Sequence, residues 1–557
     1  MAKAKLRVIP LGGCGEIGKN MTVIELGNEA IIIDSGIMFP ANDMHGVDYI
    51  IPDFQYLVDR DDLKIHGVIF THGHEDHIGA VAHVLEKYPD LTLYATPLTA
   101  SLIEVKLSNA RKFNEARIQG EPNIQVIHAG TNFTVGPFKI EPFRMTHSIP
   151  DCVGLAINTP FGLIVHTGDY KFDNSPVDGK KPDYAKLAEL GKRGVKLLLA
   201  DSTNADKPGW TASEATIEPA FERVFARAKG RILIATFASL MSRVQQAANV
   251  ARKTGRKIVI AGYTMREYIK IARNIGYLDI PDNLILDPGK INTMDPTKLV
   301  ILVTGSQGEP AAVLSKLAHG RHKFLEIRKN DTVILSSHPI PGNEELVYRT
   351  INKLIQRGAD VVYDPLERVH VSGHARQDEM RLLINLIQPQ FLVPVHGEIR
   401  HLVEHKKLAI ETGVPESNVI VVENGTVIEV DKHYVRKGER IPGGYVFVDG
   451  SGVGDIGRAV IRDREILARD GFLIVSVNLD RSSGRLVGEP EIVSRGFIYL
   501  RDAEELLGAV RYTVEDVLNH NQSMNGRRRE LIEESVGRLL YNETRRRPMV
   551  FSIVNEV

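Results

Sequence analysis

The stretch THGHEDH at residues 71–77 follows the apolar run GVIF at residues 67–70 and is the most informative part of the sequence for the fold. Four of its side chains are of types that ligate metal ions: His72, His74, Asp76 and His77. Imidazole and carboxylate groups are costly to bury without partners, so close packing does not account for four of them in one turn. Zinc takes such ligands at about 2.0–2.2 Å, and a tight turn lets the first two face one ion while the last two face another. The alternative is a histidine-rich helix cap, in which Asp76 only caps a helix that begins near Ile78.

The H-x-H-x-D-H spacing of this stretch resembles the signature of the metallo-β-lactamase superfamily. The resemblance implies two further ligands, His147 in FRMTHSIPD and Asp169 in HTGDYKFD, with Asp169 bridging two metal ions. Taken alone, His147 could be an ordinary loop histidine and Asp169 a turn former. A relative of this fold that carries di-iron for redox chemistry has Glu at the position of His74. The nitrogen-rich set in this chain therefore favours zinc hydrolysis.

The chain around this stretch has the pattern of an α/β protein. Short β-rich runs broken by Gly, Asn and Asp occupy residues 5–70, and a helix, a strand and a helix follow over 76–107. Strand-like runs then return as far as residue 205, which fits a β-sandwich with helices packed outside. Over residues 211–371 helices alternate with short buried strands, which argues for a mostly parallel sheet.

Three motifs after residue 200 narrow the class of hydrolase. They are ADSTN at 200–204, VSGHA at 371–375 and PVHGE at 394–398. With a long α/β insertion between the first two, they resemble the β-CASP nucleases, whose helper positions fall on Asp201, His374 and His396. Further motifs make residues 5–440 similar to the bacterial ribonuclease J family: LGGCGEIGKNM, DSGIMFP, ATFASLMSRVQQ, GSQGEP and SSHPIPGNE.

This resemblance implies a metallo-β-lactamase αββα sandwich with an inserted α/β β-CASP domain, a linker and a small α+β C-terminal domain. We predict the sandwich over 1–205 and 372–440, the insertion over 206–371, the linker over 441–460 and the C-terminal domain over 461–557. The linker is rich in Gly and Asp and is expected to hold one short strand. The C-terminal domain is expected to hold the strand FLIVSVNLD, two charged helices and the strand MVFSIVNEV.

The resemblance also implies a mechanism with two zinc ions per chain. Their expected ligands are His72, His74, His147 and Asp169 for one ion and Asp76, His77, Asp169 and His396 for the other. A water shared by two zinc ions has a pKa near or below about 7, which supplies hydroxide to attack phosphorus. The expected catalytic residues are Asp76, Asp201 and His374, with His374 oriented by Asp201 and donating a proton as the 3′-hydroxyl departs. The product keeps a 5′ phosphate. A structural His374 is the alternative, and a need for manganese or magnesium stays open.

For the substrate, the family implies 5′-to-3′ exonuclease action on single-stranded RNA with a 5′ monophosphate, and additional endonuclease activity, in RNA processing and decay. A phosphate pocket one nucleotide from the metals is expected at Ser239, Ser372 and His374, because hydroxyls and N–H groups at loop or helix starts suit phosphate oxygens. Gly305 and Gly308 in GSQGEP would let the backbone approach RNA closely. The alternative is that all of these are ordinary turns between strand and helix.

Composition bounds the remaining possibilities. The chain has 557 residues with 69 Lys+Arg and 70 Asp+Glu, so a polyanion must be held by a local basic groove rather than by net charge. Hydrophobic residues make up 43% and charged residues 25%, which excludes whole-chain disorder, collagen and coiled coil. No apolar run approaches the ~18–20 residues of a membrane span. Because only Cys14 and Cys152 are present, we expect no disulfide framework and a cytoplasmic protein.

Partners are less constrained by the sequence. The basic runs at 321–323, 527–529 and 545–547 lie among acidic neighbours, which is typical of solvated helix faces. We expect a homo-oligomer, dimer or tetramer, formed through the C-terminal domain, with no membrane contact. A helicase or degradosome partner stays open. Two other functions compete: a small-molecule metallo-hydrolase, which would not need the insertion, and an RNA-binding scaffold, which would be expected to lose ligands.

Overall fold

The computed structural model describes residues 5–41, 43–309, 312–340, 343–450, 452–498, 503–520 and 527–557. Two compact units make up the chain: residues 1–39 with 48–451, and residues 40–47 with 452–557. Pro310 of GSQGEP and Pro341 and Gly342 of SSHPIPGNE lie outside the described residues. Among the described residues, no helix is long and apolar enough to cross a membrane.

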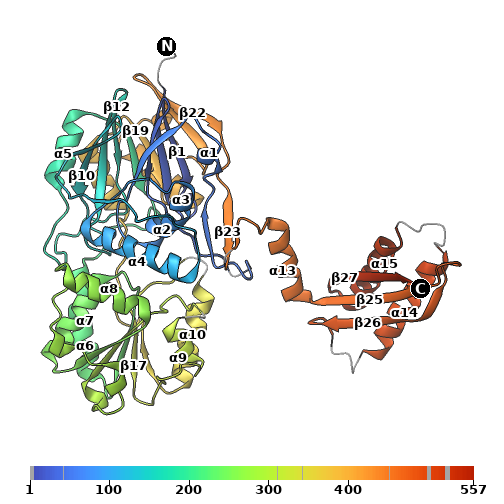
Figure 1. Ribbon diagram of the computed structural model, residues 1–557. Helices are drawn as coiled ribbons and strands as arrows, with labels where there is room; N and C mark the ends of the chain where they lie inside the picture. Colours follow the sequence, from blue (N-terminus) through green and yellow to red (C-terminus); the bar gives the residue numbers. More distant parts are fainter. Residues whose placement is uncertain are drawn as a thin grey trace. The chain divides into compact units, whose positions relative to one another are not determined.

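The first unit contains a sandwich of an eight-stranded and a six-stranded sheet (Figure 1). The larger sheet has the order β22 (Val435–Arg440), β21 (Thr426–Val430), β1 (Leu6–Gly12), β3 (Met21–Leu26), β4 (Glu29–Ile33), β6 (Lys64–Ile69), β7 (Leu93–Ala95) and β8 (Ile124–Val126). The smaller has the order β19 (Phe391–Val395), β13 (Val195–Asp201), β12 (Gly162–His166), β11 (Val153–Thr159), β10 (Phe138–Arg144) and β9 (Phe133–Val135). Side chains of both sheets, Ile24 and Leu155 among them, form one buried core between them.

Helices cover the two outer faces of this sandwich. The helices of this part are α1 (Gln55–Val58), α2 (Glu75–Ile78), α3 (Val81–Lys87), α4 (Pro97–Phe113), α5 (Tyr184–Arg193), α11 (Gln377–Ile387) and α12 (Ile399–Glu411), with the 3-10 turn η5 (Glu416–Asn418). Apolar residues of α3 and α4 pack on the larger sheet, and those of α5, α11 and α12 pack on the smaller one. Helix α4 begins with Pro97 in its first turn and ends at Asn114 in a left-handed conformation, as expected for helix boundaries. The predicted αββα sandwich is confirmed.

The inserted part is a five-stranded sheet in which all neighbouring strands are parallel, as the βα alternation predicts. Its order is β15 (Lys257–Ala261), β16 (Leu299–Val303), β14 (Ile232–Ala235), β17 (Thr332–Leu335) and β18 (Asp360–Val362). One face packs against α6 (Ile217–Arg227), α7 (Met241–Lys253) and α8 (Tyr263–Asn274), and the other against α9 (Val313–Ala318) and α10 (Glu344–Gln356) (Figure 1). The 3-10 turns are η1 (Glu214–Thr216), η2 (Asp282–Leu284), η3 (Pro288–Lys290) and η4 (Pro296–Lys298).

The sandwich and the inserted sheet share a hydrophobic core. Leu107 of α4 and Ile269 of α8 belong to one cluster of buried residues that continues into both parts. This shared core explains why the two parts form a single compact unit. Two short pairings complete the unit: β2 (Cys14–Gly15) with β20 (Gly397–Glu398), and β5 (Tyr49–Pro52) with β23 (Tyr445–Asp449).

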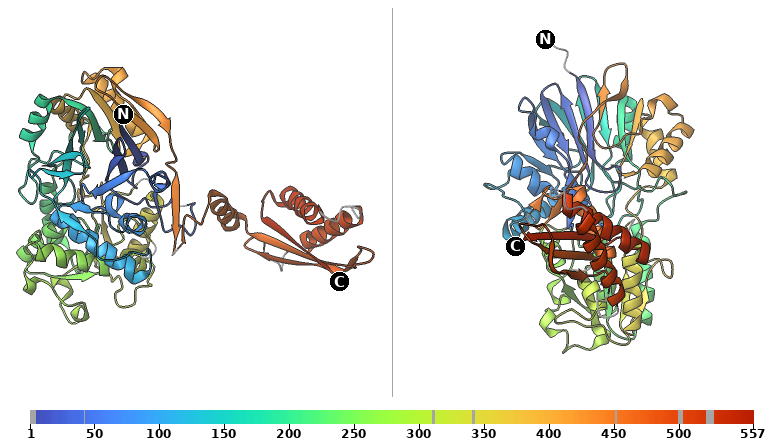
Figure 2. Two further views of the ribbon diagram at one scale, coloured as in Figure 1. Left: turned by 45° about the horizontal axis from the view of Figure 1, so that its top comes forward. Right: turned by 90° about the vertical axis from the view of Figure 1, so that its right-hand side faces the viewer.

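The second unit is an α+β domain whose three-stranded sheet is covered on one face by helices (Figure 2). It contains β24 (Gly452–Val453), α13 (Arg458–Asp470), β25 (Phe472–Leu479), β26 (Leu486–Arg495), α14 (Glu504–His520), α15 (Arg528–Thr544) and β27 (Met549–Glu556). Strand β25 pairs antiparallel with β26 and parallel with β27. Residues 40–47 belong to this unit, and Arg464 Nη1 donates to the His45 carbonyl oxygen over 3.1 Å.

Two details differ from the sequence expectations. The stretch 441–460 holds two strands and the start of α13 instead of one short strand, and pairing with β5 orders the first of them. Strand β26 was not expected, because Gly488 and Pro490 interrupt its pattern. An edge strand tolerates proline, since one side of it carries no ladder, and β26 lies at the edge of its sheet.

Candidate functional site

The candidate site lies where strands of the two sandwich sheets end. The stretch 71–77 follows β6, Asp169 follows β12, Asp201 ends β13 and His396 follows β19. Strands β12, β13 and β19 are parallel neighbours, so their carboxyl ends meet at one edge of the smaller sheet. The topology therefore brings residues that are more than 300 positions apart in the chain into one cluster.

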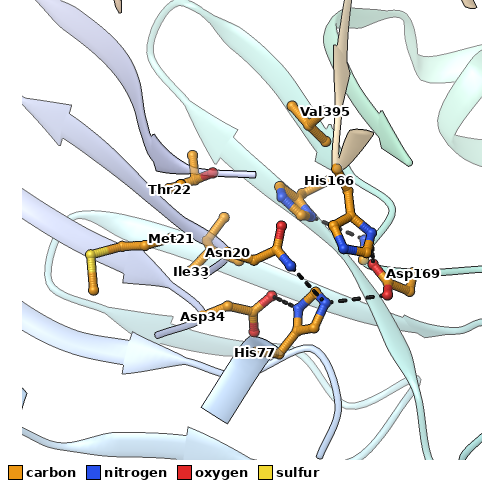
Figure 3. Close-up of a pocket in the computed structure, with 12 residues that line it drawn as sticks. Asn20, Met21, Thr22, Ile33, Asp34, His77, His166, Asp169 and Val395 are labelled. Carbon is orange, nitrogen blue, oxygen red and sulfur yellow. Dashed lines mark hydrogen bonds and ion pairs between the residues drawn. The ribbon is translucent and has the colours of Figure 1, made fainter. Parts of the chain in front are cut away.

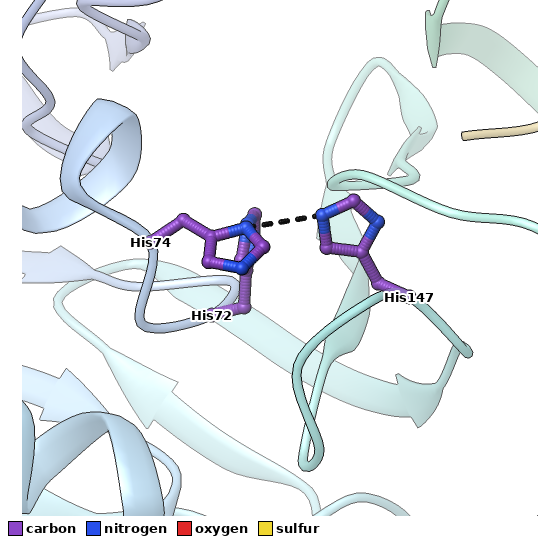
Figure 4. A group of neighbouring side chains, drawn as sticks. All are labelled: His72, His74 and His147. Atoms are coloured by element: carbon purple, nitrogen blue, oxygen red, sulfur yellow. Dashed lines mark hydrogen bonds between the residues drawn. The ribbon is translucent and has the colours of Figure 1, made fainter. Parts of the chain in front are cut away.

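One group of candidate ligands consists of three histidines (Figure 4). The Nε2 atom of His72 lies 3.2 Å from His74 Nδ1, and the Nε2 atom of His147 lies 3.1 Å from the same nitrogen. Burial lowers the pKa of His74 to about 4 and holds the pKa values of His72 and His147 well below the usual histidine range. Three neutral imidazoles thus direct nitrogen atoms at a common point, an arrangement that a bound cation stabilises.

A second group combines two carboxylates and two histidines: Asp76, His77, Asp169 and His396. His77 Nε2 lies 3.2 Å from Asp169 Oδ2 and 3.7 Å from Asp76 Oδ2. His396 has Nδ1 3.0 Å from Asp169 Oδ1 and Nε2 3.3 Å from Asp76 Oδ2. Asp169 Oδ2 is also 3.8 Å from His72 Nε2 and 3.7 Å from His147 Nε2, so this carboxylate lies between the two groups.

Charge in the second group is balanced within the protein. Burial alone would lower the pKa values of His77 and His396, but the adjacent Asp169 carboxylate raises both well above the usual range. Burial would raise the pKa values of Asp76 and Asp169, yet the two imidazoles hold both low. The carboxylates and imidazoles of this group therefore favour each other's charged forms, and a divalent cation would supply the positive charge that the two carboxylates attract.

The donor set fits a divalent metal. His396 Nε2 is buried and makes no hydrogen bond to any other described residue, although it points at the Asp76 carboxylate. Three imidazoles in one group, and mixed imidazole and carboxylate in the other, are nitrogen and oxygen ligands of the kind that zinc takes. The fold thus brings together the seven side chains named from the sequence. They form the two expected sets, except that Asp169 groups with the second set only instead of with both.

Three contacts with groups outside the two ligand sets orient these histidines. His77 Nδ1 lies 2.8 Å from Asp34 Oδ2, which leaves Nε2 facing Asp169 (Figure 3). The Thr71 hydroxyl donates to the same Asp34 oxygen over 2.9 Å and lies 3.0 Å from His72 Nδ1. His147 Nδ1 donates to the Gly373 carbonyl over 2.7 Å. Such partners fix the ring orientation and tautomer of metal-binding histidines.

Sequence reasoning had not singled out Asp34 or Thr71. Asp34 ends the apolar run AIII in a left-handed conformation with φ of 61°, which is uncommon for a residue other than glycine. The sequence feature that could have identified Asp34 as a site residue is its position directly after a buried strand, because many strands of this sandwich end in a polar residue. Asn20 is a further missed neighbour, with its amide nitrogen 3.1 Å from His77 Nε2 (Figure 3).

His374 and Asp201 form a separate pair beside the candidate metal groups. His374 Nδ1 lies 2.8 Å from Asp201 Oδ2, and the His374 ring centre lies 4.8 Å from that of His147. Burial would raise the pKa of Asp201, but His374 holds it well below the usual range, so the carboxylate accepts the hydrogen bond. Asp169, Asp201, His374 and His396 are close enough to form a third potential ligand group. The short His374–Asp201 contact instead matches an oriented acid–base histidine.

Ser372 lies next to this pair. Its hydroxyl oxygen accepts a hydrogen bond from Asn204 Nδ2 over 2.8 Å and another from the His374 amide over 3.2 Å. With its lone pairs used, the Ser372 hydroxyl keeps its proton available for an anion. Ser239 lies in the turn before α7, and Ser242 of the same segment donates to the Ser148 carbonyl over 3.3 Å, which joins this turn to the loop of His147. Among the described residues, no hydrogen bond links the Ser239 side chain to the metal groups.

Local structure within the inserted part explains why residues 305 and 308 are glycines. Both have positive φ, 102° and 78°. A Cβ atom at Gly305 would lie 2.7 Å from the Ala312 Cβ, and one at Gly308 would lie 2.8 Å from the Leu346 carbonyl carbon. Local packing therefore requires glycine at both positions without any contact to RNA.

Family models match most of the chain in four blocks. They are described as metallo-beta-lactamase superfamily (residues 14–203), ribonuclease J beta-CASP domain (229–354), Zn-dependent metallo-hydrolase RNA specificity domain (358–422) and ribonuclease J C-terminal domain (459–557). The chain is also 39% identical over 556 residues to ribonuclease J2 of Bacillus subtilis strain 168, covering 99% of each protein. The chain belongs to the ribonuclease J family.

Other ribonuclease J proteins are similar over most of their length. Ribonuclease J of Synechocystis is 39% identical, with 98% of this chain and 86% of that protein covered. Ribonuclease J 1 of Streptococcus pyogenes serotype M3 is 39% identical, covering 98% and 97%. A crystal structure of a protein of unknown function from Enterococcus faecalis V583 has the same fold, with a TM-score of 0.54 at 17% identity, covering 77% of this chain and all of that one.

Membership of the ribonuclease J family makes the chain a metal-dependent ribonuclease. The metallo-β-lactamase fold implies a divalent metal, and the RNA specificity domain implies an RNA substrate. The expectation of a β-CASP nuclease is therefore confirmed at the level of family, fold and general activity.

Proposed function

We propose that the protein is a di-zinc ribonuclease that degrades single-stranded RNA from its 5′ end, prefers a 5′ monophosphate and also cleaves internally. The observation that carries this proposal is the pairing of two ligand groups around Asp169 with the His374–Asp201 hydrogen bond at their edge. His72, His74, His147 and Asp169 would hold one zinc ion. Asp76, His77, Asp169 and His396 would hold the other. Two such ions supply hydroxide at neutral pH and neutralise the charge on phosphate oxygens.

The chain's own groups would perform the remaining steps. Asp201 holds the His374 ring by its Nδ1 hydrogen, so that Nε2 is the atom able to deliver a proton. The P–O3′ bond breaks and that proton goes to the departing 3′ oxygen of the upstream nucleotide, while the phosphate stays on the 5′ oxygen of the downstream product. Asp76 would act as a metal ligand, and its carboxylate also lies next to His396 Nε2. The side chain of His374 is 19% exposed, which leaves it accessible to substrate.

The 5′ phosphate pocket is proposed at Ser372, His374 and Ser239. The free hydroxyl proton of Ser372 supports this assignment, because a phosphate oxygen is its natural acceptor. Gly305 and Gly308 stay in the proposal only as part of the pocket wall, since packing already accounts for them. A closed pocket for the terminal nucleotide favours exonuclease action.

We further propose a division of the chain into the five segments given above, a homo-oligomer formed through the C-terminal domain, a helicase or degradosome partner, and a location in the cytoplasm. Zinc is the proposed resident metal, with manganese or magnesium as a possible additional requirement. Family membership favours an RNA substrate over a small molecule, and a full set of ligand-type residues argues against a purely scaffolding role.

A time course with one 3′-labelled RNA tests the proposal. The RNA carries a 5′ monophosphate, triphosphate or hydroxyl, and wild-type protein is compared with His77→Ala and His374→Ala. His433→Ala, at an exposed histidine of the same unit, serves as control. We expect stepwise shortening that favours the monophosphate, is lost in the first two variants and is unchanged in the control. Internal fragments insensitive to the 5′ group would refute the pocket, and full activity of His77→Ala would refute the ligand assignment.

A further inference from the structure

Glu75 is the one acidic residue in the stretch 71–77 that belongs to neither ligand group. It follows His74 of the first group and precedes Asp76 of the second. Its carboxylate instead accepts two hydrogen bonds from elsewhere in the unit. Lys106 Nζ, from α4 of the sandwich, donates to Oε2 over 2.9 Å. The Tyr268 hydroxyl, from α8 of the inserted part, donates to Oε1 over a longer distance of 3.4 Å.

These contacts lie at the junction between the two parts of the first unit. Tyr268 is only 4% exposed, whereas the side chains of Lys106 and Glu75 are 17% and 36% exposed. Helices α4 and α8 pack against each other, and a second contact joins them, with Lys112 Nζ 5.2 Å from the centre of the Tyr263 ring. An isolated, exposed ion pair has loose geometry and contributes little, but here the partly exposed Glu75 carboxylate is also held by the buried Tyr268 hydroxyl.

The backbone of the same stretch is also anchored. The Ile37 amide donates to the Glu75 carbonyl over 3.0 Å, and the Asn20 amide donates to the Asp76 carbonyl over 3.0 Å. The Glu75 side chain adds contacts with helices α4 and α8 that Asp34 and Thr71 do not make. Because Glu75 separates the two ligand groups along the chain, its orientation helps to set the spacing between His74 and Asp76.

We propose that Tyr268 and Lys106 are positioning residues that hold Glu75 and thereby keep both candidate metal groups in register. The inserted part is then a structural component of the metal site, in addition to any contact that it makes with RNA. This inference rests on the ligand assignment of the proposed function. It gives Glu75 a role that neither metal binding nor helix capping provides, since α2 has no side-chain cap hydrogen bond.

Tyr268→Phe tests the inference because it removes one hydroxyl and leaves the ring in the shared core. Removing groups that orient metal ligands typically costs about 10–100-fold in metal affinity or activity. The hydrogen bond here is long, so we expect the low end, about a tenfold loss of kcat with KM within twofold. Metal retention, measured by competition with a chelator in the absence of RNA, is expected to weaken by a similar factor. Tyr263→Phe, at a half-exposed tyrosine of the same helix, is the matched control and is expected to behave as wild type.

A double-mutant cycle identifies the partner. If Tyr268 acts through Glu75, the losses of Tyr268→Phe and Glu75→Gln are not additive, whereas additive losses would overturn the inference. Lys106→Met removes the other partner of Glu75 and is expected to show the same non-additivity with Glu75→Gln. It replaces Tyr268→Phe as the test if Tyr268→Phe lowers the melting temperature. Wild-type metal retention in both Tyr268→Phe and Lys106→Met also overturns it. His77→Ala is measured in parallel: if it too retains metal, the ligand assignment itself is wrong, and otherwise only the positioning role has failed.

Discussion

Replacing Asp34 by Asn gives the sharpest test of how the histidines are oriented. The Asp34 carboxylate accepts from Thr71 through both oxygens, at 2.8 Å from the amide and 2.9 Å from the hydroxyl, and lies 2.8 Å from His77 Nδ1. The asparagine amide can place an oxygen toward only one side of this network. His77 Nδ1 and the Thr71 hydroxyl share Oδ2, and the Thr71 amide contacts Oδ1. Depending on how the asparagine side chain is turned, either the first two groups or the Thr71 amide then face an NH₂ group instead of an acceptor.

The magnitude follows from the contacts that are lost. A hydrogen bond to a charged group contributes about 1.5–3 kcal/mol, and each 1.4 kcal/mol is a factor of about ten in an equilibrium constant. This range agrees with the loss of about 10–100-fold in metal affinity or activity that is typical when a hydrogen-bond partner of a metal-binding histidine is removed. We therefore expect Asp34→Asn to lose about 10–100-fold in metal affinity and in kcat/KM. Asparagine tolerates the left-handed backbone of this position, so the fold itself should be preserved.

The assay pairs chelator competition with RNA cleavage on the same protein sample. Asp61→Asn, at an exposed aspartate of the same unit, controls for the loss of one negative charge. Thermal unfolding confirms that both variants are folded. Metal affinity and kcat/KM within twofold of wild type in Asp34→Asn would contradict this prediction, because they would mean that the ring of His77 needs no support from this carboxylate.

Three further predictions concern the same unit. In Gly373→Ala, the added Cβ would lie 2.5 Å from His147 Cε1, so the His147 ring must be displaced. We expect a kcat/KM about 100-fold lower, and a twofold effect would contradict this prediction. Removal of metal by a chelator should abolish RNA cleavage and lower the melting temperature, and added zinc should restore both; cleavage that persists would argue against metal dependence. Glu141→Gln should cost about 1–2 kcal/mol of unfolding free energy at pH 7, because the guanidinium of Arg193 and the ammonium of Lys186 lower the Glu141 pKa to about 2. That difference should be constant above pH 4.5 and shrink as the pH falls toward about 2, as urea unfolding at several pH values would show; a gap independent of pH would contradict it.

The elements that the sequence predicted well have strong local patterns. The parallel strands of the inserted part are short apolar runs between helices, so the pattern of one segment is enough to recognise each of them. Strand β26 lacks such a pattern because of Gly488 and Pro490, and its strand conformation depends on pairing with β25. Strand β23, which lies within the predicted linker, also depends on pairing, and its partner β5 lies almost 400 residues earlier.

The kind of site could be predicted from the sequence alone, because His72, His74, Asp76 and His77 are ligand-type residues packed into one turn. The family could be predicted in the same way, through motifs that need no three-dimensional information. The folded chain was needed to show which ordinary residues support the site. Asp34, Thr71 and Tyr268 belong to common residue types, and their contacts with the histidine stretch depend on strand ends and helices being brought together. Such roles follow from proximity in space, and no spacing along the chain encodes them.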